Sequence, residues 1–493
     1  MFGLERVDGE MGGAKGNRTP DLLIANETLY QLSYSPFSTS AYACPLPLIK
    51  IARAVWDLVR HSVSPGAGPV EPLELGEYSR KRVPSTKGPT MAEEFGTVVI
   101  GAGLAGGTVV ESLRDAGYTA RIALVGTEPA APYYRPDLSK KVMIEGSDPA
   151  DSALRGEDWY SAHDVETFFG TSVTAVDTDA QTLTLDDGGD LSYCQVILAT
   201  GSVPRTLDVP GAQLANIHTL RDAGDALAIR SQFGEGKKVA IIGGGWIGLE
   251  VAAAAKSHGC DVTVILHTDA PPLSGVLGQE LGEYFEDLHR KNGVNFLKNA
   301  DTTAFTGDSA VEAVETSAGS VPADLVVIGI GADPAVDLAS SADLTTENGV
   351  IVDERMRTSD GSILAIGDIA NAKNVLRGER LRVEHWDNAV RQAEVAASTI
   401  SGGTKSYDWQ PYFYTDQFDL GMEYVGRGGS EDDVVIRGDK SSGEFIVFWH
   451  RGGKVTAAMN VNVWDYGDEL RALIGKEVSA DRLADEQVPV GEL

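Results

Sequence analysis

The chain has 493 residues, enough for about two to four domains that each bury a core, and it contains 42% hydrophobic residues, 23% charged residues and 56 glycines. Its formal net charge of −31 excludes a broad nucleic-acid-binding surface, because neutralising phosphates requires clustered Lys and Arg. No apolar run reaches the roughly 18 residues that a membrane span needs, so we expect no membrane partner.

The chain has three cysteines, Cys44, Cys194 and Cys260, and no two of them form a CxxC or CxxxxC pair. The sequence therefore encodes neither a disulfide framework nor a closed zinc site, and we predict no metal site. This cysteine content favours a reducing, cytoplasmic compartment.

The first 90 residues differ from the rest in their clusters of Gly, Pro and Ser. Their one amphipathic stretch, residues 47–60, is too short to fold alone. Residues 16–30 resemble peptides that arise when a transfer-RNA gene region is translated conceptually. We expect residues 1–90 to be a disordered or wrongly assigned extension, with Met91 as the true start. A real flexible extension is the alternative.

From Met91 onward, strands and helices are predicted to alternate. Residues 95–100 form a short apolar run that meets a Gly-rich turn, a helical stretch extends to Arg114, and residues 122–125 form a second apolar run. This order predicts a βαβ unit.

The same pattern returns farther along the chain. A strand is predicted at residues 239–242, an Ala-rich helix extends to His258, and a second strand covers residues 262–265. Another strand is predicted at residues 325–328 and a helix at 388–400. Two nucleotide-binding folds in one chain are therefore expected.

The pattern changes again in the last 90 or so residues. Strands are predicted at residues 445–449 and 454–461, and a helix at 466–475. The predicted fold class is thus α/β, with two Rossmann-like dinucleotide-binding domains plus a small C-terminal α+β domain.

Each predicted nucleotide fold carries a glycine fingerprint between its first strand and its helix. The first fingerprint is GAGLAG at residues 101–106, and the second is GGGWIG at residues 243–248. In such a loop the first glycine makes a tight turn, the second lets the backbone approach a pyrophosphate, and the third allows close helix–strand packing. The two loops predict two dinucleotide sites.

A ribose-binding residue is expected about 20 residues after each fingerprint. Thr127 and Glu128 are the candidates at the first site. At the second site Leu266 replaces the expected Asp or Glu, and no Arg is present to bind a 2′-phosphate. The second site therefore has neither the acidic residue typical of an NAD site nor the arginine typical of an NADP site. Because the arginine is absent, we favour NAD over NADP.

Beyond the fingerprints, the chain contains an ordered series of motifs: YRPDLSK at 134–140, ATGSVPR at 199–205, GIGADP at 329–334, AIGD at 365–368, EHW at 384–386 and PYFYTDQ at 411–417. With these motifs, residues 91–493 resemble the FAD-dependent, NADH-dependent ferredoxin reductases of oxygenase systems. That family includes putidaredoxin and rubredoxin reductases and belongs to the pyridine nucleotide-disulfide oxidoreductase superfamily.

The resemblance implies that FAD occupies the first site and NADH, rather than NADPH, the second. The residues implied for FAD binding are Gly101, Gly103, Ala105, Gly106, Thr127, Glu128, Arg135, Lys140, Val173, Thr200, Gly201, Gly367, Asp368 and Trp386. Those implied for NAD binding are Gly243, Gly245, Ile247, Gly248, Glu250 and Gly331.

Three of these residues are implied to be catalytic. Lys140 resembles the lysine beside flavin N5, Glu250 the glutamate that pairs with it, and Trp386 an aromatic residue next to the flavin. The Asp368 carboxylate is expected to accept hydrogen bonds from the ribityl chain. The helix after Trp386 is expected to direct its positive end at the flavin ring.

The chain departs from the family pattern at two positions. Asp137 replaces a proline, and its carboxylate is expected either to shift the flavin potential or to face solvent. His218 stands where a relative has an arginine that touches FAD, so that contact moves to Arg221 or is lost.

The resemblance also implies a domain order. The FAD-binding domain is expected to be discontinuous, at residues 91–207 and 325–404, with the NAD(P)-binding domain inserted at 208–324. Residues 405–493 are expected to form a C-terminal reductase interface domain.

The cysteines distinguish the functions open to such a flavoprotein. Disulfide reductases need a cysteine pair beside the flavin and peroxidases a single cysteine there, and neither pattern occurs near the flavin motifs. We therefore expect an enzyme that passes electrons from NADH through FAD to a ferredoxin-type iron–sulfur protein of an oxygenase system. The alternatives are an NADH oxidase or quinone reductase, and a redox-sensing protein like apoptosis-inducing factor.

Ferredoxins are typically acidic, so a reductase with this net charge needs a local cationic face. We hypothesise that a basic cluster forms this docking face. The alternative is that these residues are only solvated loop residues. The cluster comprises Lys373, Arg377, Arg380, Arg382 and Arg391.

The expected oligomeric state is a monomer or a homodimer.

Overall fold

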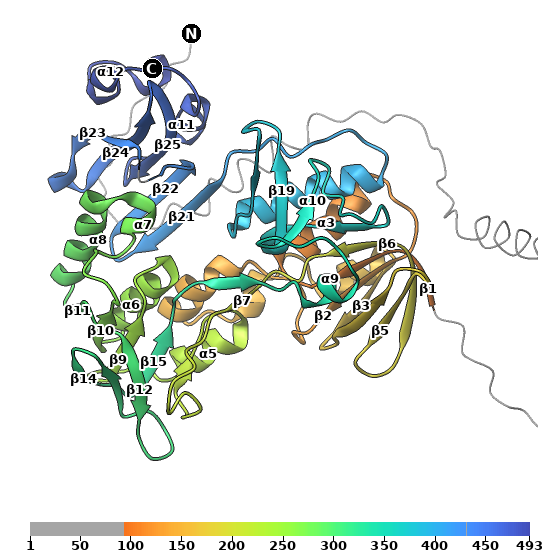
Figure 1. Cartoon of the computed structure of the whole chain (residues 1–493), viewed down its shortest axis with the longest axis horizontal. Helices are drawn as coiled ribbons and strands as arrows, with labels where there is room; N and C mark the ends of the chain where they lie inside the picture. Colours follow the sequence, from red (N-terminus) through yellow and green to blue (C-terminus); the bar gives the residue numbers. More distant parts are fainter. Residues whose placement is uncertain (1–92, 430) are drawn as a thin grey trace, which may run out of the picture. The chain divides into compact units, whose positions relative to one another are not determined.

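The computed structural model describes residues 93–429 and 431–493, so the predictions for residues 1–90 lie outside it. Among the described residues, no helix combines the length and the apolar character needed to cross a membrane. These residues build two nucleotide-binding folds and an antiparallel C-terminal sheet (Figure 1).

The first fold is centred on a βαβ unit of β1 (Glu93–Ile100), α3 (Leu104–Asp115) and β2 (Ile122–Gly126). β1 pairs in parallel with β2 on one side and with β6 (Asp190–Leu198) on the other. β18 (Ile363–Ala365) extends the sheet on the far side of β6. All five residues of β2 are buried, as expected of a parallel strand covered on both faces. The predicted unit is confirmed.

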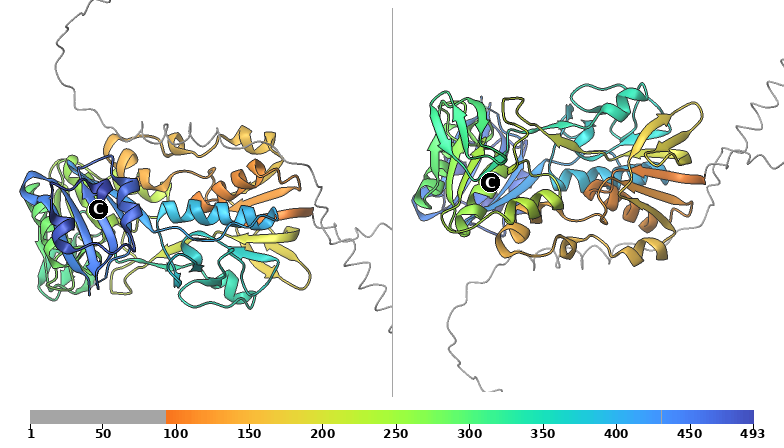
Figure 2. Two further views of the ribbon diagram at one scale, coloured as in Figure 1. Left: turned by 90° about the horizontal axis from the view of Figure 1, so that it is seen from above. Right: turned by 90° about the horizontal axis from the view of Figure 1, so that it is seen from below.

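Helix α10 (Trp386–Ile400) packs beside α3, although the two are far apart in the sequence (Figure 2). Its buried face is rich in alanine, and these small side chains let the two helices approach closely. Midway along α10, Gln392 accepts a hydrogen bond from the backbone N–H of Gly367 at 2.8 Å. This contact holds α10 against the loop after β18.

The second fold is a parallel sheet with β9 (Lys238–Ile242) at its centre, followed by α6 (Trp246–Ser257). β9 pairs with β10 (Asp261–Ile265) and with β15 (Leu325–Ile328). The edge strands are β8 (Ile217–His218) and β11 (Asn295–Leu297).

The pairing of β15 corrects one predicted domain boundary. The sequence predicts residues 325–328 to lie in the FAD-binding domain, but they pair with β9 in the second sheet. An apolar run of four buried residues fits the middle of either parallel sheet, and periodicity does not say which sheet it joins.

The C-terminal domain is an antiparallel sheet with the strand order β21-β22-β25-β24-β23, accompanied by α11 (Gly467–Leu473) and α12 (Ala480–Ala484). The strands are β21 (Tyr412–Gln417), β22 (Leu420–Gly426), β23 (Asp433–Asp439), β24 (Glu444–Arg451) and β25 (Lys454–Val461). The predicted α+β character is confirmed. β21 lies against both α6 and α10, so its side chains reach the nucleotide-binding folds.

Candidate functional site

One cavity of about 780 Å³ is lined by residues of both glycine loops. The predicted site residues that line it are Gly101, Gly103, Ala105, Thr127, Glu128, Arg135, Lys140, Val173, Thr200, Gly201, Gly245, Ile247, Glu250, Gly331, Gly367, Asp368 and Trp386. The two predicted dinucleotide sites therefore open into a shared space.

The first and third glycines of each loop are required by the backbone conformation and by close packing. Gly101 and Gly243 have φ angles of 114° and 106°, which favour glycine. A Cβ atom on Gly106 or Gly248 would press on the carbonyl oxygen of the first glycine of the same loop. Gly106, Gly243 and Gly248 do not line the cavity, so their positions agree with a packing and turning role.

The middle glycines face open space. A Cβ atom built on Gly103 would come no closer than 3.7 Å to a neighbour, the Arg135 side chain. One on Gly245 would lie 3.8 Å from the Gly329 carbonyl oxygen. Because both glycines line the cavity, a methyl group there would occupy ligand space instead of colliding with protein.

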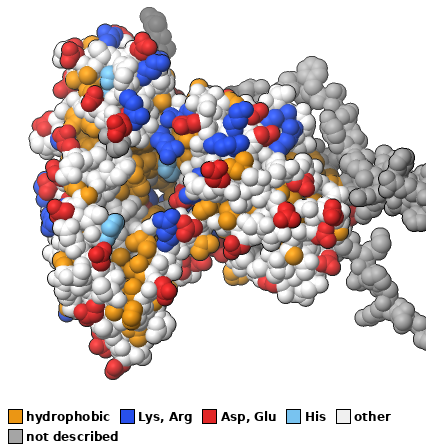
Figure 3. Space-filling view, in the orientation of Figure 1, with side chains coloured by type: hydrophobic (Ala, Val, Ile, Leu, Met, Phe, Trp, Pro, Cys, Tyr) orange, Lys and Arg blue, Asp and Glu red, His pale blue; other side chains and the backbone are white. Residues whose placement is uncertain are grey.

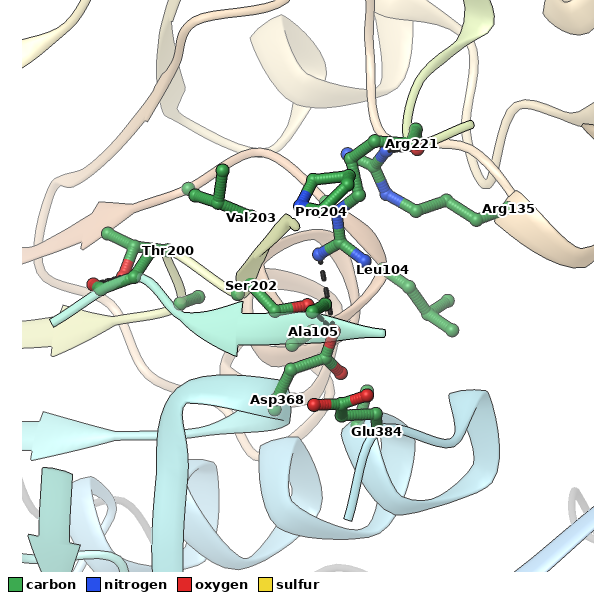
Figure 4. A pocket seen from close by; sticks show the side chains of 18 of the residues that line it. Leu104, Ala105, Arg135, Thr200, Ser202, Val203, Pro204, Arg221, Asp368 and Glu384 are labelled. Atoms are coloured by element: carbon green, nitrogen blue, oxygen red, sulfur yellow. Dashed lines mark hydrogen bonds and ion pairs between the residues drawn. The ribbon is translucent and has the colours of Figure 1, made fainter. Parts of the chain in front are cut away.

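Asp368 lies where the first fold, the loop after β8 and η4 (Gly367–Ile369) meet (Figure 4). Its Oδ2 atom accepts hydrogen bonds from Ser202 Oγ at 2.9 Å and from Arg221 Nη2 at 3.2 Å. Both donors use the same oxygen, which leaves Oδ1 available to a ligand hydroxyl. Arg221 also forms an ion pair with this half-buried carboxylate.

A second cluster fixes the predicted ribose-binding end of the first site. Glu128 accepts a hydrogen bond from Tyr133 Oη at 2.6 Å and pairs with the Arg135 guanidinium. Arg135 also donates to the backbone carbonyl of Arg221. Glu128 is thus held by protein donors, while Thr127 is exposed at the cavity edge.

Lys140 and Glu250 form a buried ion pair where the two folds meet. Lys140 Nζ lies 2.9 Å from Glu250 Oε2, and the two side chains are 12% and 5% exposed. Ser139 donates to the same oxygen, and Thr415 donates to Oε1 at 2.6 Å. The buried Glu250 carboxylate thus accepts from three donors, and it holds the Lys140 side chain at the cavity wall.

Trp386 begins α10 at the cavity wall, next to His385. The Nε1 atom of Trp386 and the Nδ1 atom of His385 are buried and have no hydrogen-bond partner within the described part of the chain. Burial lowers the pKa of His385 to about 4, so the ring is neutral. The Trp386 ring makes an edge contact with Tyr134, at 5.5 Å between centroids.

The structure locates both residues at which the chain departs from the family pattern. Asp137 is buried and accepts from Lys141 Nζ at 2.9 Å and Ser152 Oγ at 2.7 Å, so the expectation that it faces solvent is wrong, and its effect on the flavin potential stays a prediction. His218 contacts Gln232, and Arg221 lines the cavity instead.

Sequence reasoning gave no role to Ser139, Ser202, Tyr414 or Thr415. Ser139, Ser202 and Tyr414 line the cavity, and Thr415 bonds to Glu250 from the C-terminal domain. All four lie within motifs that carried the family resemblance. No sequence signal could have shown which of these side chains converge on one carboxylate.

The side chains at the predicted ribose position of the second site do not distinguish NAD from NADP. Leu266 is buried, and the three residues that follow it are exposed outside the cavity lining. The preference for NAD over NADP therefore stays a prediction.

Residues 95–393 match the family model for pyridine nucleotide-disulphide oxidoreductases, and residues 412–493 match the reductase C-terminal model. The protein belongs to the pyridine nucleotide-disulphide oxidoreductase family.

Several members of this oxidoreductase family are close in sequence or structure. The ferredoxin–NAD(+) reductase component of the anthranilate 1,2-dioxygenase system of Burkholderia cepacia is 39% identical, over 79% of this chain and 97% of the relative. Putidaredoxin reductase of Pseudomonas putida is 36% identical, over 80% and 96%. The crystal structure of the covalent putidaredoxin reductase–putidaredoxin complex superposes with a TM-score of 0.77 at 34% identity, over 81% of this chain and 97% of that one.

Flavoproteins of this family bind FAD, and the cavity of this oxidoreductase fits that group. The open face of Gly103 accommodates a pyrophosphate against the N-terminus of α3. Asp368 offers a free acceptor oxygen to hydroxyl groups, and the unpartnered Trp386 Nε1 offers a donor. The residues present are therefore those that a flavin dinucleotide requires.

Proposed function

We propose that this oxidoreductase transfers electrons from NADH to a ferredoxin-type iron–sulfur protein that serves an oxygenase. The observation that carries the proposal is the single cavity lined by both glycine loops, with the Lys140–Glu250 pair in its wall. Relatives at 35–39% identity are named as ferredoxin reductase components of anthranilate dioxygenase and dehydrodivanillate demethylase systems.

The residues divide into two binding sets. Gly101, Gly103 and Asp368 would hold FAD, while Gly245 and Glu250 belong to the part of the cavity that would receive NADH. Bound FAD would supply the chemistry that accepts a hydride and releases single electrons. The chain supplies orientation and electrostatics.

Two features favour negative charge in the cavity. The Lys140 side chain, paired with Glu250 inside a buried site, lies in the cavity wall. α10 begins at the cavity wall, so its first backbone N–H groups and its dipole add a partial positive charge there. Neutral His385 adds none, because burial keeps its pKa near 4.

The positions of the cysteines favour an electron acceptor that is a separate protein. Neither Cys194 nor Cys260, the cysteines within residues 93–429 and 431–493, lines the cavity. Cys260 is buried in the second fold, where burial raises the pKa of its thiol. No thiol in the described cavity wall can relay electrons, so we propose that the carrier takes them from the flavin directly.

The proposed docking surface is the basic cluster named above (Figure 3). Lys and Arg side chains gather over β19 (Ala370–Asn374) and α10, and Leu376, two residues after β19 in the chain, is exposed. Several cations are already paired, including Lys373 with Glu354 at 3.1 Å. Arg380 donates to two backbone carbonyls. Because these acceptors are neutral, the hydrogen bonds do not neutralise its positive charge. A surface that combines an exposed apolar residue with the Arg380 cation suits an acidic protein partner.

Charge reversal tests the docking surface. Lys373→Glu combined with Arg377→Glu should raise the apparent KM for a ferredoxin about tenfold and leave NADH-to-dye turnover unchanged. Arg121→Glu, which reverses a charge in an exposed ion pair with Glu166, is the matched control. Equal KM values for all variants would exclude this surface.

Cytochrome c reduction tests the function itself. With NADH and the FAD-loaded protein, the rate should rise strongly when a ferredoxin of an oxygenase system is added. Rapid turnover with oxygen or quinone alone would indicate an oxidase or quinone reductase instead. Slow turnover with a long-lived NADH complex would indicate a redox-sensing protein.

A further inference from the structure

The Glu250 carboxylate is held from the C-terminal domain as well as by Lys140. Thr415, on β21, donates from Oγ1 to Glu250 Oε1 at 2.6 Å across 165 residues of sequence. Ser139 and Lys140 occupy the other oxygen, Oε2. Thr415 and Glu250 are only 1% and 4% exposed, so water does not replace the threonine if its hydroxyl is removed.

A second buried side chain, Gln417, orients the Thr415 hydroxyl so that it donates to Glu250. Gln417 Nε2 donates to Thr415 Oγ1 at 3.1 Å. A hydroxyl has one proton, so accepting from Gln417 directs the threonine proton toward Glu250. The Gln417 carbonyl oxygen is occupied in turn, since it lies 2.8 Å from His289 Nε2.

His289 lies on α8 (Gln279–Lys291) and is fully buried. Burial lowers the pKa of His289 to about 4, so the ring is neutral and carries one N–H. Its Nδ1 atom has no partner among the described residues, whereas Nε2 faces the Gln417 oxygen, which places the proton on Nε2. His289, Gln417 and Thr415 thus form a donor chain, in which each member donates toward Glu250.

The donor chain decides how the carboxylate is oriented. With Oε1 taken by Thr415, only Oε2 faces Ser139 and Lys140, and the ammonium is held at the cavity wall. Building on the function proposed above, we infer that Thr415 is a positioning residue that fixes the Glu250 carboxylate, so that the C-terminal domain takes part in the NADH half-reaction. This role is separate from partner docking.

Thr415→Val tests the inference, because valine keeps the shape of threonine and removes the hydroxyl. The midpoint potential of the bound flavin should fall, since the carboxylate loses a donor and its negative charge is less compensated. The limiting rate of flavin reduction by NADH should fall roughly tenfold, at an unchanged half-saturating NADH concentration. Thr415→Ser should restore both values to within twofold of the parent protein.

Thr456→Val is the matched control, since it removes another threonine hydroxyl bonded to a carboxylate, Asp432, within the same domain and outside the cavity lining. If Thr415→Val does not retain FAD, Gln417→Met replaces it, and a shift of the potential in the same direction is expected. A potential and rate equal to those of the parent would overturn the inference, as would equal losses in Thr415→Ser and Thr415→Val. If the parent protein itself is not reduced by NADH, the proposed function fails instead.

Discussion

The Nζ atom of Lys140 and the Oε2 atom of Glu250 lie 2.9 Å apart, although 110 residues separate them in the sequence. Lys140 stands on η2 (Leu138–Glu145) of the first fold and Glu250 on α6 of the second. Their ion pair therefore joins the two nucleotide folds at the wall of the shared cavity.

Lys140→Met should impair the NADH half-reaction and the stability together. The variant leaves the buried Glu250 without its cation, which costs about 3 kcal/mol in the free energy of unfolding. Stopped-flow absorbance should show flavin reduction slowed by at least about tenfold. Lys454→Met is the control, because Lys454 pairs with Glu477 through two exposed side chains outside the cavity lining. Equal reduction rates in the two variants would contradict the assigned role.

Gly103→Ala and Gly245→Ala should each weaken the binding of a different ligand. Each new methyl group projects into the cavity without colliding with the protein, so both variants should fold normally. Gly103→Ala should lose most of its bound FAD, measured by absorbance after gel filtration. Gly245→Ala should keep FAD and raise the KM for NADH about tenfold. The two loops have been assigned wrongly if the effects are reversed.

Asp368→Ala should weaken FAD binding by about ten- to a hundredfold, because a hydrogen bond to a charged group contributes about 1.5–3 kcal/mol. Fluorescence titration of the apoprotein with FAD measures the dissociation constant. Asp333→Ala serves as the control, since Asp333 forms an exposed pair with Arg205 and does not line the cavity. A dissociation constant unchanged by Asp368→Ala would show that this carboxylate does not touch the ligand.

Stability should fall as the pH falls from about 6.5 toward 4. The pKa of His289 is about 4 in the folded chain and 6.5 when exposed, so the unfolded chain binds the extra proton first. His289 therefore contributes about 3 kcal/mol at neutral pH that is lost across this window. Thermal melts of the FAD-loaded protein at several pH values measure the effect. His289→Gln should melt lower at pH 7.5 and show a shallower decline. A decline as steep as that of the parent would exclude His289 as its source.

The parts of the fold that follow local rules could be predicted from the sequence. The apolar runs at β1 and β9 were found because a strand, a glycine turn and a helix follow one another within each unit. The position of β15 could not be predicted, since pairing partners in a parallel sheet depend on contacts distant in sequence.

The same limit applies to the site. Lys140, Glu250 and Asp368 were named because they lie in motifs of a known family, and all three line the cavity. The donors Ser202 and Thr415 were missed because they reach those carboxylates only after the folds and the C-terminal sheet pack together. The burial and the orientation of a side chain decide which hydroxyl groups bond to these carboxylates, and neither property can be inferred from the residue type.

The most direct test of the account is an anaerobic titration of the FAD-loaded protein with NADH, followed by absorbance. One equivalent of NADH should bleach the flavin band, and adding an oxidised ferredoxin should restore the band while the ferredoxin becomes reduced. A protein that remains colourless after incubation with FAD, or a flavin band that NADH leaves unchanged, would contradict the account.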